Sequence, residues 1–262
     1  MNNPAEIADA TLRAGENKLN LMRNNKGRLA VASMMAGAFI AFGGTLSLVV
    51  GFGFPEISAG NPSLQKFMAG AMFPIGLILV VTLGAELFTG NNALLIPAFM
   101  RKRCGAGEVV KNWTLVYLGN FVGAMAFTYF MVYYCGLTAN GPWHDAVLGI
   151  VKAKTSMSWG VVLVKGIGAN WCVCLAIWLA LSSKSFTGKA LGCWLPVMAF
   201  VVLGYEHCIA NMFYLPLGLM EGSDVEVMKC ITANMIPATL GNIIGGALFV
   251  GCLHSYLHLR KQ

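Results

Sequence analysis

Six hydrophobic stretches constrain the fold of this 262-residue chain more than any other feature. A helix needs about 20 apolar residues to cross the hydrocarbon core of a bilayer. Within that core the backbone polar groups have to be satisfied inside the protein, which stretches of this length achieve as helices. We therefore predict an all-α integral membrane protein with six transmembrane spans. The stretches are 29–53, 67–100, 112–136, 158–182, 190–220 and 234–257.

The composition supports this class and excludes others. Hydrophobic residues make up 57% of the chain and charged residues only 11%, whereas soluble domains contain about 25% charged residues. The net charge of +7 is expected to reflect membrane topology and anionic lipid headgroups. No basic patch points to a nucleic-acid partner. The expected surroundings of the protein are therefore the lipid bilayer.

One motif occurs twice inside these hydrophobic stretches, as G-x-E-L-F-T-G-N at 84–91 and as G-x-E-H-C-I-A-N at 204–211. Each copy places a glutamate, Glu86 or Glu206, five residues before an asparagine, Asn91 or Asn211. An ionisable group inside a membrane is costly and therefore a candidate for a functional site. Glycine-interrupted hydrophobic segments in corresponding halves of a chain also point to a transport site.

A second pair of motifs shows that the chain is duplicated. Asn112 and the sequence Gly119-Asn120-x-x-Gly123 recur 122 residues later as Asn234 and Gly241-Asn242-x-x-Gly245. We therefore predict two repeats, at about 29–136 and 158–257, within a single channel domain at 29–257. Three spans per repeat is an odd number, so the second repeat is predicted to be inverted.

The second and fifth stretches are too long for one straight span. Each contains the glutamate motif near its middle, so each is predicted to consist of two half-helices joined by non-helical backbone. Such backbone is tolerated in a membrane only where it lines a cavity or is buried in protein.

Lys and Arg residues are unevenly distributed between the two sets of loops. Thirteen lie in the N-terminal tail, in the loops after the second and fourth spans, and in the C-terminal tail at 258–262. Only Lys66, Lys152, Lys154 and Lys229 lie in the opposite loops. Cytoplasmic loops carry the excess of Lys and Arg, so both termini are predicted to be cytoplasmic in a multi-pass protein of the inner or plasma membrane.

Two segments outside the spans are also interpreted. Residues 1–28 are predicted to be a cytoplasmic amphipathic helix, because apolar residues recur at helical spacing; a frayed tail is the alternative. The loop before the fourth span contains Trp143, His144 and Asp145, which are predicted to lie at the membrane interface.

His207 is the residue of the repeated motif with the clearest chemical potential. An imidazole can change its charge between pH 5 and 8, and His207 lies in an otherwise apolar run beside Glu206. It is predicted to meet a permeant anion, the alternative being a buried neutral histidine bonded to a backbone carbonyl or to Asn211. The other repeat has Leu87 at this position and offers the hydroxyl of Thr89 instead.

The two glutamates are predicted to be structural. A carboxylate in the permeation path would repel an anion, so Glu86 and Glu206 are expected to bond free backbone amides of the two breaks. The half-helices that begin near Asn91 and Asn211 would direct the positive ends of their dipoles inward, which favours a small anion.

Bulky apolar residues near the breaks are candidates for constrictions that exclude water, and ordinary packing is the alternative for each of them. They are Phe73, Leu77, Leu87, Phe88, Val173 and Phe200.

An enzyme, a metal site and a cofactor all lack support in the sequence. The chain contains neither G-x-S-x-G nor H-E-x-x-H. Its eight cysteines include no C-x-x-C pair and are interpreted as small packing residues.

Six motifs in one order resemble those of the formate/nitrite transporter family. They are A-E-L-F-T-G-N (85–91), K-N-W (111–113), G-N-F-V-G-A (119–124), A-N-W-C-V-C-L-A-x-W (169–178), G-Y-E-H-C-I-A-N-M (204–212) and I-P-A-T-L-G-N-I-I-G-G (236–246). The resemblance implies a homopentameric channel for small anions with an aquaporin-like fold. A neutral-solute channel of the aquaporin class is the alternative, but such channels usually have N-P-A at the breaks, where this chain has T-G-N and I-A-N.

The resemblance also implies roles for single residues. His207, Thr89 and Asn170 correspond to pore residues, and Lys154 to a lysine that draws anions into an outer vestibule. Leu77, Leu87, Phe88 and Val173 would line an inner constriction, and Phe73 and Phe200 an outer one. Phenylalanine at both outer positions favours formate, which would cross with a proton relayed by His207; nitrite and hydrosulfide are the alternatives. Lys165 departs from similar sequences, which have an apolar residue at this position. It is expected to extend to the outer membrane interface, the alternative being that it faces the vestibule, strengthens anion attraction and alters selectivity.

Overall fold

The computed structural model describes residues 2–259 and contains no strand among them. The first half of the chain forms α1 (Pro4–Asn24), α2 (Lys26–Gly51), α3 (Pro55–Gly60), α4 (Pro62–Met72), α5 (Ile75–Leu83), α6 (Phe88–Leu94), α7 (Ile96–Met100), α8 (Ala106–Phe127) and the π-helical turn η1 (Thr128–Tyr133). The second half forms α9 (Gly141–Ser156), α10 (Trp159–Ser182), α11 (Phe186–Val202), α12 (Cys208–Met220), α13 (Val227–Lys229), η2 (Cys230–Met235), α14 (Ile236–Gly246), η3 (Ala247–Cys252) and α15 (Leu253–His258).

Five of these helical runs are long and apolar enough to cross a membrane: Lys26–Gly51, Pro62–Leu83, Ala106–Tyr133, Trp159–Ser182 and Val227–His258. The remaining predicted stretch, 190–220, is divided between two shorter apolar helices, α11 and α12. The prediction of an all-helical membrane protein is confirmed. The inverted relation of its halves stays a prediction.

Both glutamate motifs interrupt a helix. α5 ends at Gly84 with φ 71°, and the corresponding Gly204 follows α11 with φ 67°. This left-handed conformation is readily adopted by glycine and rarely by other residues. The chain then runs extended to Leu87 and His207, the N-cap residues of α6 and α12. The sequence therefore places two short helices with their N-termini inside the protein.

Close contacts at glycine hold the long helices together. In the crossing of α2 and α8, a Cβ added to Gly37 would collide with the backbone of Asn120, and one added to Gly123 with the carbonyl of Met34. Gly241 and Gly245 of α14 meet the backbone of α10 in the same way. Small residues at such crossings let helix backbones approach in a membrane.

Gly123→Ala is therefore expected to destabilise the protein by about 1–3 kcal/mol, because the helices have to separate. Gly107→Ala in the same helix is the matched control, since a Cβ at that position meets nothing within 4 Å. Thermal unfolding in detergent would compare the two. Equal melting temperatures for both variants would contradict the close crossing.

Among the described residues, four helices lie wholly outside the predicted spans, namely α1, α9 and the short helices α3 and α13. The connection before the fourth span, which was predicted only as a loop, contains the helix α9 (Gly141–Ser156). α1 begins with a capping box between Asn3 and Glu6 and contacts α7, α10 and α15. Its apolar face is buried against the bundle, with Ile7, Leu19 and Met22 each at most 9% exposed.

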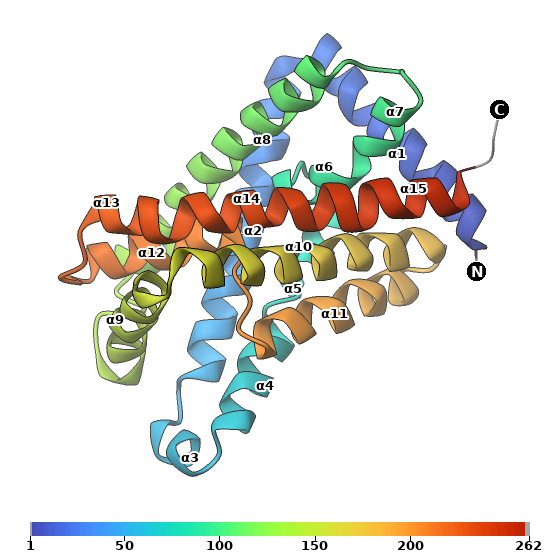
Figure 1. Cartoon of the computed structure of the whole chain (residues 1–262). Coiled ribbons are helices and arrows are strands. Elements are labelled where there is room, and N and C mark those ends of the chain that lie inside the picture. The colour runs from blue at the N-terminus through green and yellow to red at the C-terminus, as the bar shows by residue number, and fades with distance from the viewer. Residues whose placement is uncertain (1, 260–262) are drawn as a thin grey trace.

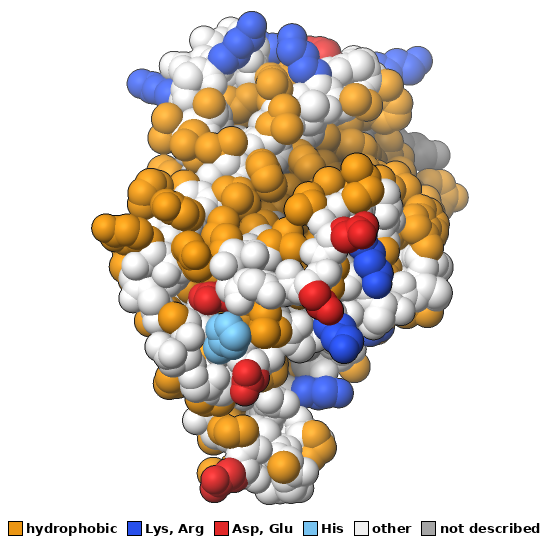
Figure 2. Space-filling view, turned by 90° about the vertical axis from the view of Figure 1, so that its left-hand side faces the viewer, with side chains coloured by type: hydrophobic (Ala, Val, Ile, Leu, Met, Phe, Trp, Pro, Cys, Tyr) orange, Lys and Arg blue, Asp and Glu red, His pale blue; other side chains and the backbone are white. Residues whose placement is uncertain are grey.

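Figure 1 shows α10 and α14 running side by side across the molecule. The start of α1 and the end of α15 lie on the same side of this view. Residues 260–262 of the predicted tail lie outside the described part of the chain. Figure 2, which faces α9 and α13, shows hydrophobic side chains between Lys and Arg at the top and mixed charges below. Which end faces the cytoplasm stays a prediction.

Candidate functional site

The two helix breaks meet at a hydrogen bond between the repeats. His207 Nε2 lies 3.0 Å from Thr89 Oγ1, and both side chains are buried, at 2% and 0% exposure. The two residues are 118 positions apart in the sequence. The structure thus brings together the two polar groups that the motif predicted from different repeats.

The backbone fixes the proton on His207. The amide N–H of Ala210 donates to His207 Nδ1 at 3.1 Å, so Nδ1 has to be the acceptor. In the neutral imidazole the proton then sits on Nε2 and is donated to Thr89 Oγ1. His207 is therefore the N-cap of α12, and a second proton on Nδ1 would require this cap to open.

Glu206 is held by one cation and two amides. Lys154 Nζ donates to both of its carboxylate oxygens at 3.0 Å. Asn211 Nδ2 and Asn234 Nδ2 donate to Oε2 at 2.8 Å and 3.1 Å. Such pairing and hydrogen bonding make a buried carboxylate tolerable. Lys154, which comes from α9, is thus joined to a break in another part of the chain.

The first repeat builds a matching arrangement around Glu86. Lys18 Nζ, from α1, lies 2.9 Å from Glu86 Oε1. Asn91 Nδ2 donates to Glu86 Oε2 and to Asn112 Oδ1, each at 2.9 Å. α1 therefore does for the first break what α9 does for the second.

The predicted bonds from the glutamates to free backbone amides are wrong, because two asparagines satisfy the breaks instead. Asn242 Oδ1 accepts from the amide of Cys208 at 2.8 Å, and its Nδ2 donates to the carbonyls of Gly166 and Glu206. Asn120 makes the same three kinds of bond, accepting from the amide of Phe88. A side-chain amide suits this task because it offers both donors and acceptors.

Asn170 lies beside the breaks and is fully buried. Its Nδ2 donates to Asn242 O at 2.6 Å, to Thr89 O at 3.1 Å and to Asn92 Oδ1 at 3.1 Å. These bonds tie α10 to both repeats at the level of Thr89.

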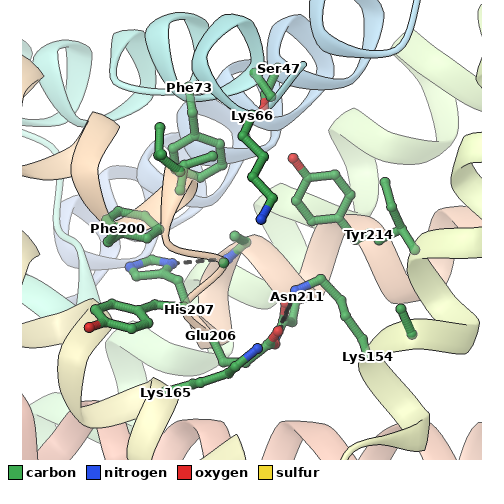
Figure 3. A pocket seen from close by; sticks show the side chains of 18 of the residues that line it. Ser47, Lys66, Phe73, Lys154, Lys165, Phe200, Glu206, His207, Asn211 and Tyr214 are labelled. Carbon is green, nitrogen blue, oxygen red and sulfur yellow. Dashed lines mark hydrogen bonds and ion pairs between the residues drawn. The ribbon is translucent and has the colours of Figure 1, made fainter. Parts of the chain in front are cut away.

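A cavity of about 510 Å³, called the vestibule here, is lined in part by Glu206 and His207 of the second break. Its charged residues are Lys66, Lys154, Lys165 and Glu206, which give a formal net charge of +2. Figure 3 shows the lysines entering from different sides around Glu206 and His207.

Two aromatic side chains, Phe73 and Phe200, line the vestibule beside His207 and are called its floor here. The rings of Phe73 and Phe200 meet edge to face, with 5.7 Å between centroids. Phe200 stacks on the imidazole of His207 at 5.8 Å and 21°. The two residues predicted for an outer constriction therefore lie together against the histidine.

The residues predicted for the inner constriction are all buried in the core, at 2–3% exposure, and do not line the vestibule: Leu77, Leu87, Phe88 and Val173. The ring of Phe88 packs against Tyr117 and Trp113 of α8. Among residues 2–259, no three His, Cys, Asp or Glu side chains are placed to hold a metal ion.

Four buried asparagines and one lysine were not predicted as residues of the site. The offset of 122 residues contained a signal for Asn112, Asn120, Asn234 and Asn242, since a polar residue repeated inside apolar spans needs a partner. Nothing in the sequence marked Lys18, which meets Glu86 only through the docking of α1.

Known proteins resemble this chain over nearly its whole length. The family model described as formate/nitrite transporter matches residues 5–256. A protein of Methanothermobacter thermautotrophicus named probable formate transporter is 40% identical over 250 residues, 90% of each chain.

Solved structures agree with this match. An ion channel of the FNT family superposes with a TM-score of 0.87 at 30% identity, covering 96% of this chain and 98% of the other. A structure described as a pentameric formate channel with formate bound gives a TM-score of 0.79 at 31% identity, covering 90% of this chain and 98% of that one. The chain therefore belongs to the formate/nitrite transporter family, a family of membrane transport channels.

Proposed function

We propose that this protein conducts small monovalent anions, and formate in particular, with pH-dependent and proton-linked passage. The observation that carries the proposal is the hydrogen-bonded pair His207–Thr89 beneath a vestibule of net positive charge. The names of the relatives, probable formate transporter and formate channel, support formate. The family description also includes nitrite.

The vestibule attracts the anion, and its floor selects the form that passes. A positive cleft raises the local concentration of anions. The apolar rings of Phe73 and Phe200 then make a charge costly, because burying an unpaired carboxylate is unfavourable. A weak acid such as formate avoids this cost when it binds a proton, and its pKa is near that of other small carboxylates, roughly 4.

His207 gives the passage its proton link. With its proton on Nε2, the imidazole presents a hydrogen-bond donor to Thr89 or to an anion that takes the place of Thr89. When the ring gives the Nε2 proton to an anion, it has to accept another proton at Nδ1. This requires the hydrogen bond from the Ala210 N–H to Nδ1 to open. Proton transfer is therefore coupled to the N-cap of α12.

Flux into liposomes tests the proposed substrate. Purified protein is reconstituted, and the uptake of formate, nitrite and hydrosulfide is measured between pH 5 and 8, with protein-free liposomes subtracted. We expect protein-dependent formate uptake to exceed that of the other two anions and to increase as the pH falls. Faster nitrite or hydrosulfide flux would refute formate as the preferred anion.

We further propose that five copies assemble and that both termini face the cytoplasm. The pentamer is supported by the related pentameric channel, and the exposed apolar side chains of α8 and α14, such as Leu118 and Leu240, offer surfaces to neighbouring copies and lipid. The excess of Lys and Arg supports the orientation. Native mass spectrometry and cysteine accessibility at both ends would test these two proposals.

A further inference from the structure

The vestibule contains more positive charge than a single monovalent anion can neutralise. Among the described residues that line it, Glu206 is the only carboxylate, and it is bonded to Lys154 through both oxygens. The other two lysines, Lys66 of α4 and Lys165 of α10, form no ion pair with any side chain of residues 2–259. Two uncompensated cations therefore face one cavity.

The lysines come from opposite walls. Figure 3 shows Lys66 directed into the cavity from the side of Phe73, and Lys165 from the side of Glu206. The backbone of Lys165 is joined to the second helix break, because its carbonyl accepts from the amide of Glu206 at 3.3 Å. A ligand with negative charge at both ends matches this arrangement better than one with a single charge.

We propose that Lys66 and Lys165 form a binding site in the vestibule for a small dianion of the size of oxalate, and that the bound dianion blocks the channel. The cavity of about 510 Å³ lies within the range of small-molecule sites, about 300–1,000 Å³. The lysines supply the charge, and Gln65, Ser156 and Tyr205 supply polar groups along the walls.

The dianion is retained because the floor does not admit it. The cost of moving an ion into an apolar medium increases with the square of its charge, so a dianion has about four times the penalty of a monovalent ion of equal size. It would also need two protons to become neutral at the ring of Phe200. The dianion therefore occupies the path that a monovalent anion uses.

The binding site stands on the charges of the vestibule alone, whereas the block rests on the proposed function. Two experiments separate them. The first is acetylation of the purified protein in detergent by N-hydroxysuccinimide acetate, followed by mass spectrometry of each lysine. Oxalate is compared with acetate at equal ionic strength. The exposed Lys152 of α9, which does not line the vestibule, is the control within the same sample.

We expect oxalate to slow acetylation of Lys66 and Lys165 by about fivefold or more, because two charges pair with the ligand, and to leave Lys152 unaffected. Acetate is expected to protect neither lysine. Equal reaction rates with and without oxalate would refute the site. This experiment uses the native protein, so the outcome does not depend on whether a variant folds.

The second experiment measures formate uptake into liposomes with oxalate outside. Lys165→Met is expected to raise the half-inhibitory oxalate concentration by about tenfold, and Lys165→Arg to keep it within about twofold because the charge remains. Lys152→Met is the matched control and should leave inhibition unchanged. Oxalate that accumulates inside the liposomes, or that inhibits Lys165→Met as strongly as native protein, would refute the block. Absence of all anion flux would refute the proposed function and leave the acetylation result to decide on the site.

Discussion

Replacing Asn242 with alanine is expected to destabilise the protein by about 3–6 kcal/mol, because the loss of its side-chain amide leaves several buried backbone groups unpaired. The amide of Asn242 bonds one N–H and two carbonyls of different segments. All three groups are buried, and the surrounding membrane offers no water to replace the lost bonds. Thermal unfolding in detergent would show this as a large decrease in melting temperature.

Asn120→Ala is expected to match Asn242→Ala, because the two side chains make corresponding bonds in the two repeats. Thr128→Val is the control. Its hydroxyl is equally buried but bonds only the carbonyl of Ala124 in the preceding turn, which the helix already satisfies. A loss for Asn242→Ala no larger than for Thr128→Val would contradict the role of the asparagines in holding the breaks.

Replacing His207 is expected to have the largest effect on transport. If flux follows the neutral acid formed with the help of the imidazole, protein-dependent formate uptake should increase by roughly tenfold for each unit that the pH falls, because the acid fraction of formate does so above its pKa of roughly 4. In His207→Leu this dependence should disappear and uptake at pH 5 should fall by about tenfold or more. Uptake into liposomes at several pH values is the measurement.

His207→Asn separates proton transfer from structure. An asparagine at an N-cap accepts from the same backbone amides as other good capping residues, so the side chain should still accept from the amide of Ala210 at the start of α12. We expect this variant to be as stable as the native protein and to conduct without pH dependence. If formate uptake by His207→Asn keeps the native pH dependence, His207 does not relay a proton. If the variant loses stability but keeps this pH dependence, His207 acts only as the N-cap of α12.

The breaks could be predicted from the sequence because their causes are local. A glycine that precedes a glutamate inside an apolar run is unusual in any membrane helix, and Gly84 and Gly204 adopt the left-handed conformation that this position requires. The repeat of the motif added independent support. The pairing of Thr89 with His207 was predicted only as a shared centre, since their distance depends on how the repeats pack.

Partners far apart in the sequence were the least predictable part of the site. The sequence showed that Asn120 and Asn242 recur, but the atoms that they bond belong to segments up to 87 residues away. α9 was not predicted, because a helix of 16 residues is too short to be found by a search for bilayer-spanning stretches. Only its docking against the break reveals why Lys154 is placed there.

The paired arrangement of α1 and α9 means that each half of the chain neutralises its own buried carboxylate. Each half has its own lysine, glutamate and asparagines, since Lys18 serves Glu86 as Lys154 serves Glu206. Neither break therefore depends on the opposite half of the chain for its charge balance.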